Sequence, residues 1–170
     1  MERPIAARAS RARRLVELAL IALPVFATGF IGSLATIPNI PIWYEGLNKP
    51  FFNPPNWLFG PVWTALYLIM ILSCWRVLDK VRGTFHAKRA MGIFAVQLVF
   101  NALWPIVFFG LHETGLAIPV VIALDLAVYA TLIVFLQADR LSGLALVPYA
   151  AWVSFATALN IAVYWLNRGL

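Results

Sequence analysis

Residues 43–67 read WYEGLNKPFFNPPNWLFGPVWTALY and connect two long apolar segments of the chain. The stretch carries four prolines, a cluster of tryptophans and tyrosines, and one pair of opposite charges, Glu45 and Lys49. Because proline fixes φ and removes a backbone donor, such a connection has few conformations. Aromatic rings with one polar edge suit a membrane–water boundary or the cover of a ligand pocket. We therefore expect a stiff cap between two membrane helices.

The composition of the whole chain indicates an integral membrane protein. Of its 170 residues 62% are hydrophobic and 12% charged, against about a quarter charged in a soluble domain. The net charge of +6 is gathered in clusters beside apolar segments, which indicates topology signals and contacts with anionic lipid headgroups rather than a nucleic-acid surface. The single cysteine, Cys74, excludes an intramolecular disulfide and a multi-cysteine metal site. We expect no metal centre.

Five apolar segments are long enough to cross a bilayer as helices, which takes about 20 residues each. They predict an all-α membrane protein, a bundle of five transmembrane helices, at residues 15–37, 57–78, 90–109, 117–136 and 141–166. The links between them are short except for residues 38–56, so neighbouring helices run antiparallel in one domain, residues 15–168. A basic segment, residues 1–14, precedes this domain.

The distribution of lysine and arginine predicts the orientation. If the N-terminus lies inside, eleven of the 13 cations fall on the inner side and two, Lys49 and Arg168, on the outer side. Positive charge accumulates on the cytoplasmic side of membrane proteins. The N-terminus is therefore expected in the cytoplasm, and the C-terminus and the 38–56 connection outside.

Polar and aromatic side chains within the spans indicate the inward faces, because lipid cannot satisfy polar groups. Gln97, Asn101 and Trp104 share one helical stripe. At about 1.5 Å per residue, Trp63, Asn101 and Asp125 lie at similar depth in the half nearer the 38–56 connection. Together with Trp152, nearer the middle, these groups predict a pocket with a lid.

Each of these groups also has a purely structural interpretation. Gln97 and Asn101 can form interhelical hydrogen bonds, worth about 0.6 kcal/mol each. Asp125 needs a partner such as Tyr129, Thr131 or Asn101, and structural hydrogen bonding is weighed against a proton relay. Near the inner surface we expect Glu17 to pair with Arg13 and Arg14, and Arg76 to reach the headgroups.

Four segments resemble one known family: WYEGLNKPFFNPPNW, GPVWTALY, QLVFNALWPIVFFG and VPYAAWVSFATALN. They are similar to the TspO/MBR family, the tryptophan-rich sensory proteins of bacteria that are related to the mitochondrial translocator protein. The resemblance covers residues 24–168. It implies a multi-pass protein of the bacterial inner membrane, a homodimer that binds tetrapyrroles such as protoporphyrin IX as receptor or transporter and requires no cofactor.

By the same resemblance, the ligand-binding residues are Trp43, Tyr44, Pro54, Phe59, Trp63, Asn101, Trp104, Trp152 and Ala156. Helix depth adds Asp125, which matches an aspartate found in part of the family. Some bacterial members degrade porphyrin in light, and in that case Trp63 and Trp152 stand at the catalytic positions. A proton-coupled transporter gated by Asp125 is a third hypothesis, although five helices without inverted repeats argue against it. Both histidines, His86 and His112, fall in predicted loops, which favours metal-free porphyrin over haem. Ile161 replaces the tyrosine of the family's sterol motif, and no sterol role is expected.

Overall fold

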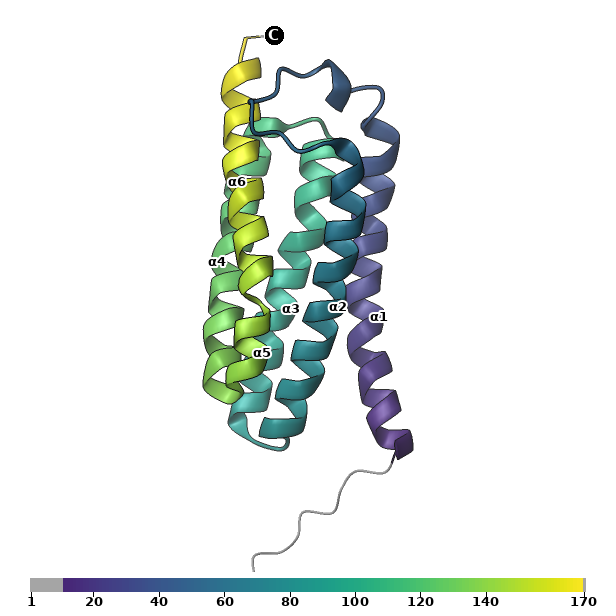
Figure 1. Ribbon diagram of the computed structural model, residues 1–170, viewed down its shortest axis with the longest axis vertical. Coiled ribbons are helices and arrows are strands. Elements are labelled where there is room, and N and C mark those ends of the chain that lie inside the picture. The colour runs from purple at the N-terminus through teal and green to yellow at the C-terminus, as the bar shows by residue number, and fades with distance from the viewer. Residues whose placement is uncertain (1–10, 170) are drawn as a thin grey trace, which may run out of the picture.

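The computed structural model describes residues 11–169, and within this range it contains helices and turns but no strand. The helices run side by side as one elongated bundle (Figure 1). Five spans are long and apolar enough to cross a membrane, which confirms the predicted all-α, five-helix fold. The basic segment 1–14 falls mostly outside the described residues. The helices and short helical turns, in chain order, are α1 (Arg11–Thr36), η1 (Ile37–Asn39), η2 (Tyr44–Gly46), α2 (Asn56–Val81), α3 (Phe85–Pro105), η3 (Ile106–Gly110), α4 (Thr114–Ala138), α5 (Arg140–Ala145) and α6 (Val147–Asn167).

The helices form a ring in which chain order and spatial order differ. α1 packs against both α2 and α3, α3 packs against α4, and α4 packs against α6. The short α5 lies between α4 and α2. α1 starts at the end opposite the C-terminus, and the segment between α1 and α2 crosses the end where α6 finishes (Figure 1). We call the end with this segment and the C-terminus the loop end, and the other the basic end.

The outward faces of the bundle are covered with apolar side chains. Large residues such as Leu20, Leu23 and Leu126 are more than 60% exposed, as lipid-facing positions require. The interior is filled mainly by aliphatic and aromatic groups, with fully buried Val25, Met70 and other side chains between the helices. The burial pattern therefore agrees with a bundle embedded in a bilayer.

The last predicted helix, residues 141–166, is in fact two helices, α5 and α6, interrupted at Leu146. Pro148 follows the interruption and has no N–H to continue the α-helical bonding. At the start of α5, the Asp139 carboxylate caps the helix by accepting the Ser142 N–H at 3.1 Å. Gly143 is required here, since a Cβ atom would lie 2.4 Å from the Leu136 side chain and 2.5 Å from its backbone nitrogen. The chain thus makes a tight hairpin between α4 and α5.

A second departure from regular helix occurs at the loop end of α3. Pro105 cannot donate to the carbonyl group one turn earlier, and the chain continues as the π-helical turn η3. The Leu111 N–H then bonds the Ile106 carbonyl at 2.8 Å, five residues back. Such widened turns often occur at functional sites. Here the turn brings Phe108 and Phe109 into the interior beneath the α1–α2 connection.

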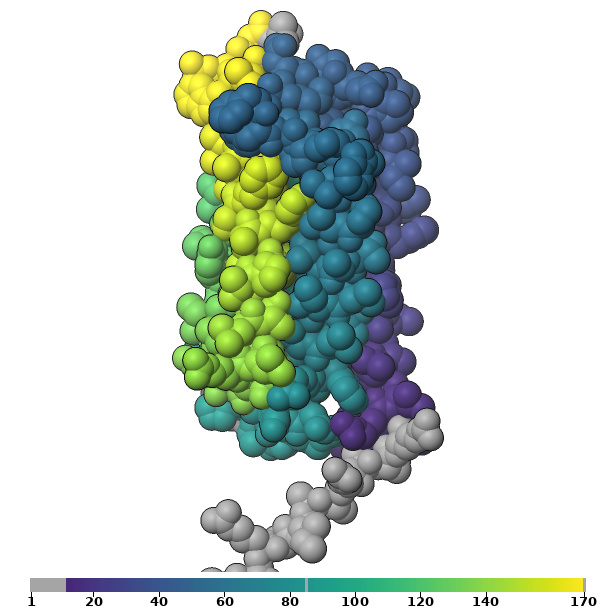
Figure 2. All heavy atoms as spheres, viewed as in Figure 1, coloured from purple at the N-terminus to yellow at the C-terminus, as the bar shows by residue number. Residues whose placement is uncertain are grey.

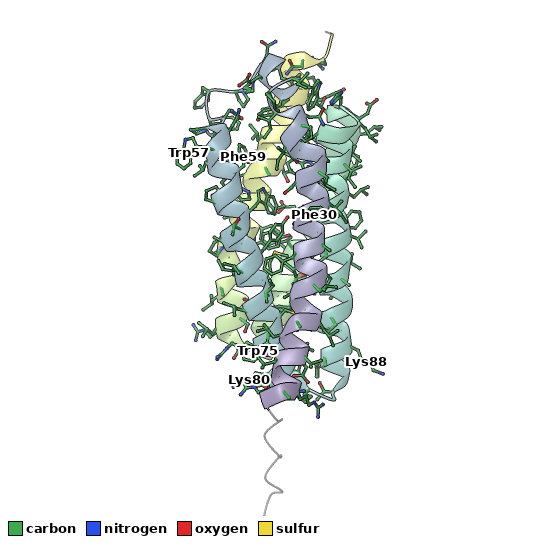
Figure 3. The ribbon with its side chains drawn as sticks, turned by 90° about the vertical axis from the view of Figure 1, so that its right-hand side faces the viewer. Phe30, Trp57, Phe59, Trp75, Lys80 and Lys88 are labelled. Carbon is green, nitrogen blue, oxygen red and sulfur yellow. The ribbon has the colours of Figure 1, made fainter. Side chains whose placement is uncertain are left out.

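Ion pairs join the helices at the basic end, where Trp75, Lys80 and Lys88 lie (Figure 3). Glu17 of α1 accepts hydrogen bonds from Arg82, which follows α2, and pairs with Arg13 at 3.2 Å. Arg14 pairs with Asp79 at 3.8 Å instead of with Glu17. The expected Arg13–Glu17 pair is present, and the expected Arg14–Glu17 pair is wrong because Asp79 of α2 lies nearer.

Arg76 also has a protein partner where we expected it to reach the headgroups. Its guanidinium donates to the Asp139 carboxylate from Nε at 2.6 Å and from Nη2 at 3.3 Å. These bonds and those from Ser142 lower the pKa of Asp139 to about 2. α2 is therefore tied to α1 through Arg82 and to the α4–α5 hairpin through Arg76.

Candidate ligand-binding site

A cavity of about 550 Å³ lies at the loop end between α1, α2 and α3. Nine of the 20 lining residues are aromatic, and five are serine, threonine or asparagine. None of the described residues that line it is charged. The lining residues are Phe26, Gly29, Phe30, Gly32, Ser33, Thr36, Ile37, Ile40, Tyr44, Asn56, Trp57, Phe59, Gly60, Trp63, Thr64, Tyr67, Asn101, Trp104, Pro105 and Phe109.

The side of the cavity between α1 and α2 depends on small residues. A Cβ atom at Gly29 would lie 2.6 Å from the Tyr67 ring, so only glycine lets α1 approach α2 here. Nearer the loop end, Phe30 of α1 and Trp57 of α2 flank the cavity and are 64% and 71% exposed. Figure 3 shows Trp57 and Phe59 near the loop end and Phe30 nearer the middle of α1, all on the loop-end side of Trp75. The cavity thus lies between two helices that are in close contact at Gly29 and Tyr67 and that present exposed rings nearer the loop end.

Residues 38–56 form a lid over the cavity, with the Tyr44 side chain facing inward. Tyr44 is 3% exposed, and its hydroxyl donates to Asn53 Oδ1 at 2.7 Å. Lys49 Nζ lies 5.0 Å from the centre of the Tyr44 ring and donates to the Glu45 and Leu47 carbonyl groups at 3.0 Å. Burial raises the pKa of Tyr44 to about 12. The lid is therefore folded on itself around a neutral, buried tyrosine.

Both halves of the lid are attached to the bundle. Trp43 stacks on His112 with ring centres 4.5 Å apart, and His112 Nε2 lies 2.9 Å from Asn39 Oδ1. Farther along, the Asn167 side chain of α6 accepts from the Asn48 N–H and donates to its carbonyl, both at 2.9 Å. Figure 2 shows this part of the chain packed over the loop end against α6. The lid is a fixed part of the fold.

A chain of four hydrogen-bonding side chains leads from the cavity into the core. The Tyr67 hydroxyl lies 3.1 Å from Asn101 Oδ1, and Asn101 Nδ2 lies 2.8 Å from the Tyr149 hydroxyl. The Tyr149 hydroxyl lies 2.7 Å from Gln97 Oε1, and Gln97 Nε2 is buried without a partner. The interhelical bonding expected for Gln97 and Asn101 is present. It joins α2, α3 and α6.

Another pair of side chains holds the ring of Trp104 in the cavity wall. Trp104 Nε1 donates to Asn160 Oδ1 at 2.9 Å, and Asn160 Nδ2 donates to the Thr114 carbonyl at 2.9 Å. With its N–H satisfied by α6, the Trp104 ring lies against Phe108 at 5.6 Å between centres. The indole is thereby positioned before any ligand arrives.

The sequence profile of the TspO/MBR family matches residues 20–166. The chain belongs to the TspO/MBR family. It is 42% identical over 153 residues to the Tryptophan-rich protein TspO of Archaeoglobus fulgidus, covering 90% of this chain and 98% of that protein. It is 42% identical over 125 residues to the Tryptophan-rich sensory protein of Cereibacter sphaeroides, covering 74% of this chain and 77% of that protein. It is 38% identical over 128 residues to the human Translocator protein, covering 75% of this chain and 76% of that protein.

Half of the ten expected ligand-binding residues line the cavity: Tyr44, Phe59, Trp63, Asn101 and Trp104. Ala156 lines a small adjoining cavity that also touches Tyr44, Phe59 and Trp104. Trp152 stands behind Phe59, with ring centres 5.9 Å apart, and its Nε1 is buried without a partner. Trp43 and Pro54 belong to the lid but are not among the lining residues.

Asp125 lies away from the cavity, in contrast to the expectation from helix depth. Its carboxylate accepts from the Ser154 hydroxyl at 3.0 and 3.1 Å, and the Tyr129 hydroxyl lies 3.1 Å from that of Ser154. Tyr129 is 43% exposed, so this group lies at the outer side of the α4–α6 contact. The position of Asp125 along α4 determines its depth but not the direction in which its side chain points around the helix.

The expected partners of Asp125 also differ. Thr131 bonds the Ala127 carbonyl of its own helix, and Asn101 is occupied by Tyr67 and Tyr149. The actual partner is Ser154, and nothing in the sequence around it indicates that it bonds Asp125. Among the described residues, no group of three histidine, cysteine or acidic side chains could hold a metal ion, and neither histidine lines the cavity.

α1 contributes lining residues to the site that were not predicted from the sequence. Phe26 and Phe30 line the cavity together with Gly29 and Gly32. In a membrane helix, phenylalanine is an ordinary lipid-facing residue, so those two carried no signal. The two glycines three residues apart are the available indication, since small residues on one face mark close helix contacts.

Proposed function

We propose that this protein binds a metal-free porphyrin, such as protoporphyrin IX, in the loop-end cavity and acts as a membrane sensor or translocator for it. The carrying observation is the neutral, aromatic-lined cavity of about 550 Å³ beneath an anchored lid. Its volume falls in the usual range of ligand pockets, about 300–1,000 Å³. Binding there would bury an apolar ligand inside the membrane.

The chemistry of the wall supports a flat aromatic ligand. Trp63, Trp104 and Phe59 come from two helices and offer ring faces and edges, the geometry in which aromatic groups attract one another. The polar side-chain groups of the described lining residues are neutral: hydroxyls and amides, such as those of Tyr67 and Asn101, and the indole N–H groups of the tryptophans. A few directional hydrogen bonds within an apolar wall orient a ligand without requiring a charge.

The names of the relatives support a sensory or translocator role. The archaeal and bacterial relatives are called tryptophan-rich, one of them a sensory protein, and the human relative is called a translocator. We extend the proposal to a homodimer whose basic end faces the cytoplasm and contacts anionic lipid headgroups. The cation clusters at Lys80–Arg82 and Lys88–Arg89 motivate that orientation.

Tryptophan fluorescence tests the proposal. Titration of the purified protein with protoporphyrin IX should give saturable quenching, and Trp63→Phe should weaken the affinity. Trp165→Phe is the matched control, because Trp165 is exposed on α6 and stacks with Arg168 at 3.6 Å, outside the cavity. Quenching that does not saturate, or equal affinities for both variants, would contradict the proposal.

Light-dependent degradation of the bound porphyrin is the second candidate, because Trp63 lines the cavity and its ring lies 5.5 Å from that of Tyr67. Illumination of the complex should then remove the porphyrin absorption band and give a new product. The rate should fall in Trp63→Phe at saturating porphyrin. An unchanged rate would leave binding as the function. The Asp125 transport hypothesis loses its basis in geometry, since Asp125 is not in the cavity wall.

A further inference from the structure

The hydrogen-bond chain Tyr67–Asn101–Tyr149–Gln97 has a buried end at Gln97 and a cavity end at Tyr67. Gln97 is 0% exposed and Tyr149 1% exposed, while Tyr67 and Asn101 line the cavity. Each of its three links joins heavy atoms 2.7–3.1 Å apart, which suits hydrogen bonds in either direction. The chain joins three helices and includes both polar side chains that α2 and α3 supply to the inner part of the cavity.

In one direction, all hydrogens point toward Gln97. Tyr67 donates to Asn101, Asn101 donates to Tyr149, and Tyr149 donates to Gln97 Oε1. The Tyr67 hydroxyl then presents only an oxygen lone pair to the cavity. The cost lies at the other end, where Gln97 Nε2 is a buried donor without a partner.

In the opposite direction, the amides of Gln97 and Asn101 are each turned by 180°, which exchanges oxygen and nitrogen without changing shape. Gln97 then donates to Tyr149, Tyr149 to Asn101, and Asn101 to Tyr67. The Tyr67 hydrogen is released toward the cavity. The unpartnered buried atom becomes a carbonyl oxygen instead of an N–H, which is the more readily tolerated of the two. Each direction leaves one orphan atom, so neither is excluded.

We propose that Gln97 makes the cavity end of this chain reversible, so that Tyr67 acts as acceptor toward ligands with an N–H or O–H group and as donor toward ligands with a ring nitrogen or carbonyl. Gln97 touches no ligand and is a positioning residue that sets the specificity of Tyr67 through two intervening residues, Tyr149 and Asn101. The ligand class is flat heteroaromatic molecules of either hydrogen-bonding polarity. A metal-free porphyrin carries both kinds of ring nitrogen. The inference rests on the proposed function, because it assigns a recognition element to the same cavity.

Two three-ring molecules of similar shape can distinguish the two directions of the hydrogen-bond chain, because one needs Tyr67 as an acceptor and the other needs it as a donor. Carbazole offers an N–H donor, and acridine, at a pH where it is neutral, offers a nitrogen acceptor. Anthracene offers neither and is the reference for both. The full-length wild-type protein should bind carbazole and acridine more tightly than anthracene, measured by quenching of the tryptophans in the cavity wall.

Gln97→Met keeps the side-chain length and removes both amide groups. Tyr149 then has no acceptor at position 97 and donates to Asn101, which fixes Tyr67 as a donor. The affinity for carbazole should fall relative to acridine by about three- to tenfold, the ratio that corresponds to one net hydrogen bond. Tyr67→Phe should bring both probes to the anthracene level.

Gln97→Glu serves as the rescue variant. A neutral glutamic acid supports both directions of the hydrogen-bond chain, whereas an ionised one supports only the acceptor form of Tyr67. The affinity for carbazole relative to acridine should therefore stay at the wild-type value or rise. Equal changes for both probes in Gln97→Met, or a shift toward acridine in Gln97→Glu, would overturn the inference.

The two proposals fail separately. If protoporphyrin IX binds at Trp63 and the ratio of the carbazole and acridine affinities does not respond to Gln97→Met, the proposed reversal of the hydrogen-bond chain is wrong and the binding function stands. If the probes respond as expected and protoporphyrin IX does not bind, the chain stands and the porphyrin assignment is wrong. If wild-type protein binds neither probe nor porphyrin, both are wrong.

Discussion

The two ends of the bundle hold α1 against α2 by different means. At the basic end, Glu17 and Arg82 form charge-assisted hydrogen bonds between the helices, and Arg14 reaches Asp79. At the loop end, the helices meet at Gly29 and Tyr67, and an uncharged cavity with a lid and many aromatic residues in its wall lies beside this contact. Ion pairs near the aqueous boundary fix the spacing of the helices, while the apolar wall leaves room that a ligand can fill.

The difference explains why the same residue type has different roles at the two ends. Trp75 at the basic end lies under Arg14, 5.0 Å from its guanidinium, which is a packing role. Trp63 and Trp104 at the loop end line the cavity. Substitutions at the loop end should therefore change ligand binding, and substitutions at the basic end should change stability.

The largest effect is expected at the cavity wall. Trp63→Ala should weaken porphyrin affinity by about 2 kcal/mol or more, roughly thirtyfold, as for truncation of a tryptophan at the centre of a binding site. Trp165→Ala on the outer face of α6 should leave the affinity within twofold. Fluorescence-independent measurement, such as porphyrin absorbance titration, checks both variants. Equal losses would show that the cavity is not the site.

A smaller effect is expected at the lid. Tyr44→Phe removes the hydroxyl that bonds Asn53 at 2.7 Å, and ligand dissociation should become about three- to tenfold faster. Stopped-flow displacement of bound porphyrin measures the rate. Tyr129→Phe, which changes a hydroxyl near Ser154 on the outer side of α4, should not alter it. A faster rate in both variants would point to general loosening of the bundle.

Breaking the ion pairs at the basic end should affect stability alone. Glu17→Gln should lower the free energy of unfolding by up to about 1 kcal/mol, because its partners Arg13 and Arg82 are partly exposed. Porphyrin affinity should stay within twofold of wild type. Thermal unfolding in detergent and the same absorbance titration measure the two quantities. A large loss of affinity would mean that the two ends are coupled.

The smallest effect is confined to acid conditions. The pKa of Asp139 is lowered from 3.8 to about 2, first by its hydrogen bond from Arg76 and then by those from Ser142. Its stabilising contribution is therefore fully present above pH 4 and is lost as the pH falls toward 2. Unfolding measured from pH 5 to pH 2 should show this loss, and Asp139→Asn should remove that part of the dependence. An identical acid profile in the variant would contradict the assignment.

Hydropathy predicted the five spans well, because each must place about 20 apolar residues in the bilayer. It could not predict the break at Leu146 or the π-helical turn after Pro105, since both lie in uninterrupted apolar sequence. A proline in a membrane helix is compatible with a kink, a break or a widened turn. Which one occurs depends on packing with neighbouring helices.

The site was predictable to the extent that residues were distinctive. Trp63, Asn101 and Trp104 stand out in apolar spans and do line the cavity. Asp125 is equally distinctive and does not, because depth along a helix says nothing about which neighbour it faces. The wall from α1 was not predicted, since Phe26 and Phe30 look like ordinary lipid-facing residues. Only the three-dimensional arrangement distinguishes them.

The most direct test is a structure of the protein with bound protoporphyrin IX. The ligand should lie between α1, α2 and α3 beneath residues 38–56, with its rings against Trp63 and Trp104. A porphyrin bound instead at the outer side of the α4–α6 contact beside Asp125, or at the basic end, would contradict the assignment of the loop-end cavity as the binding site.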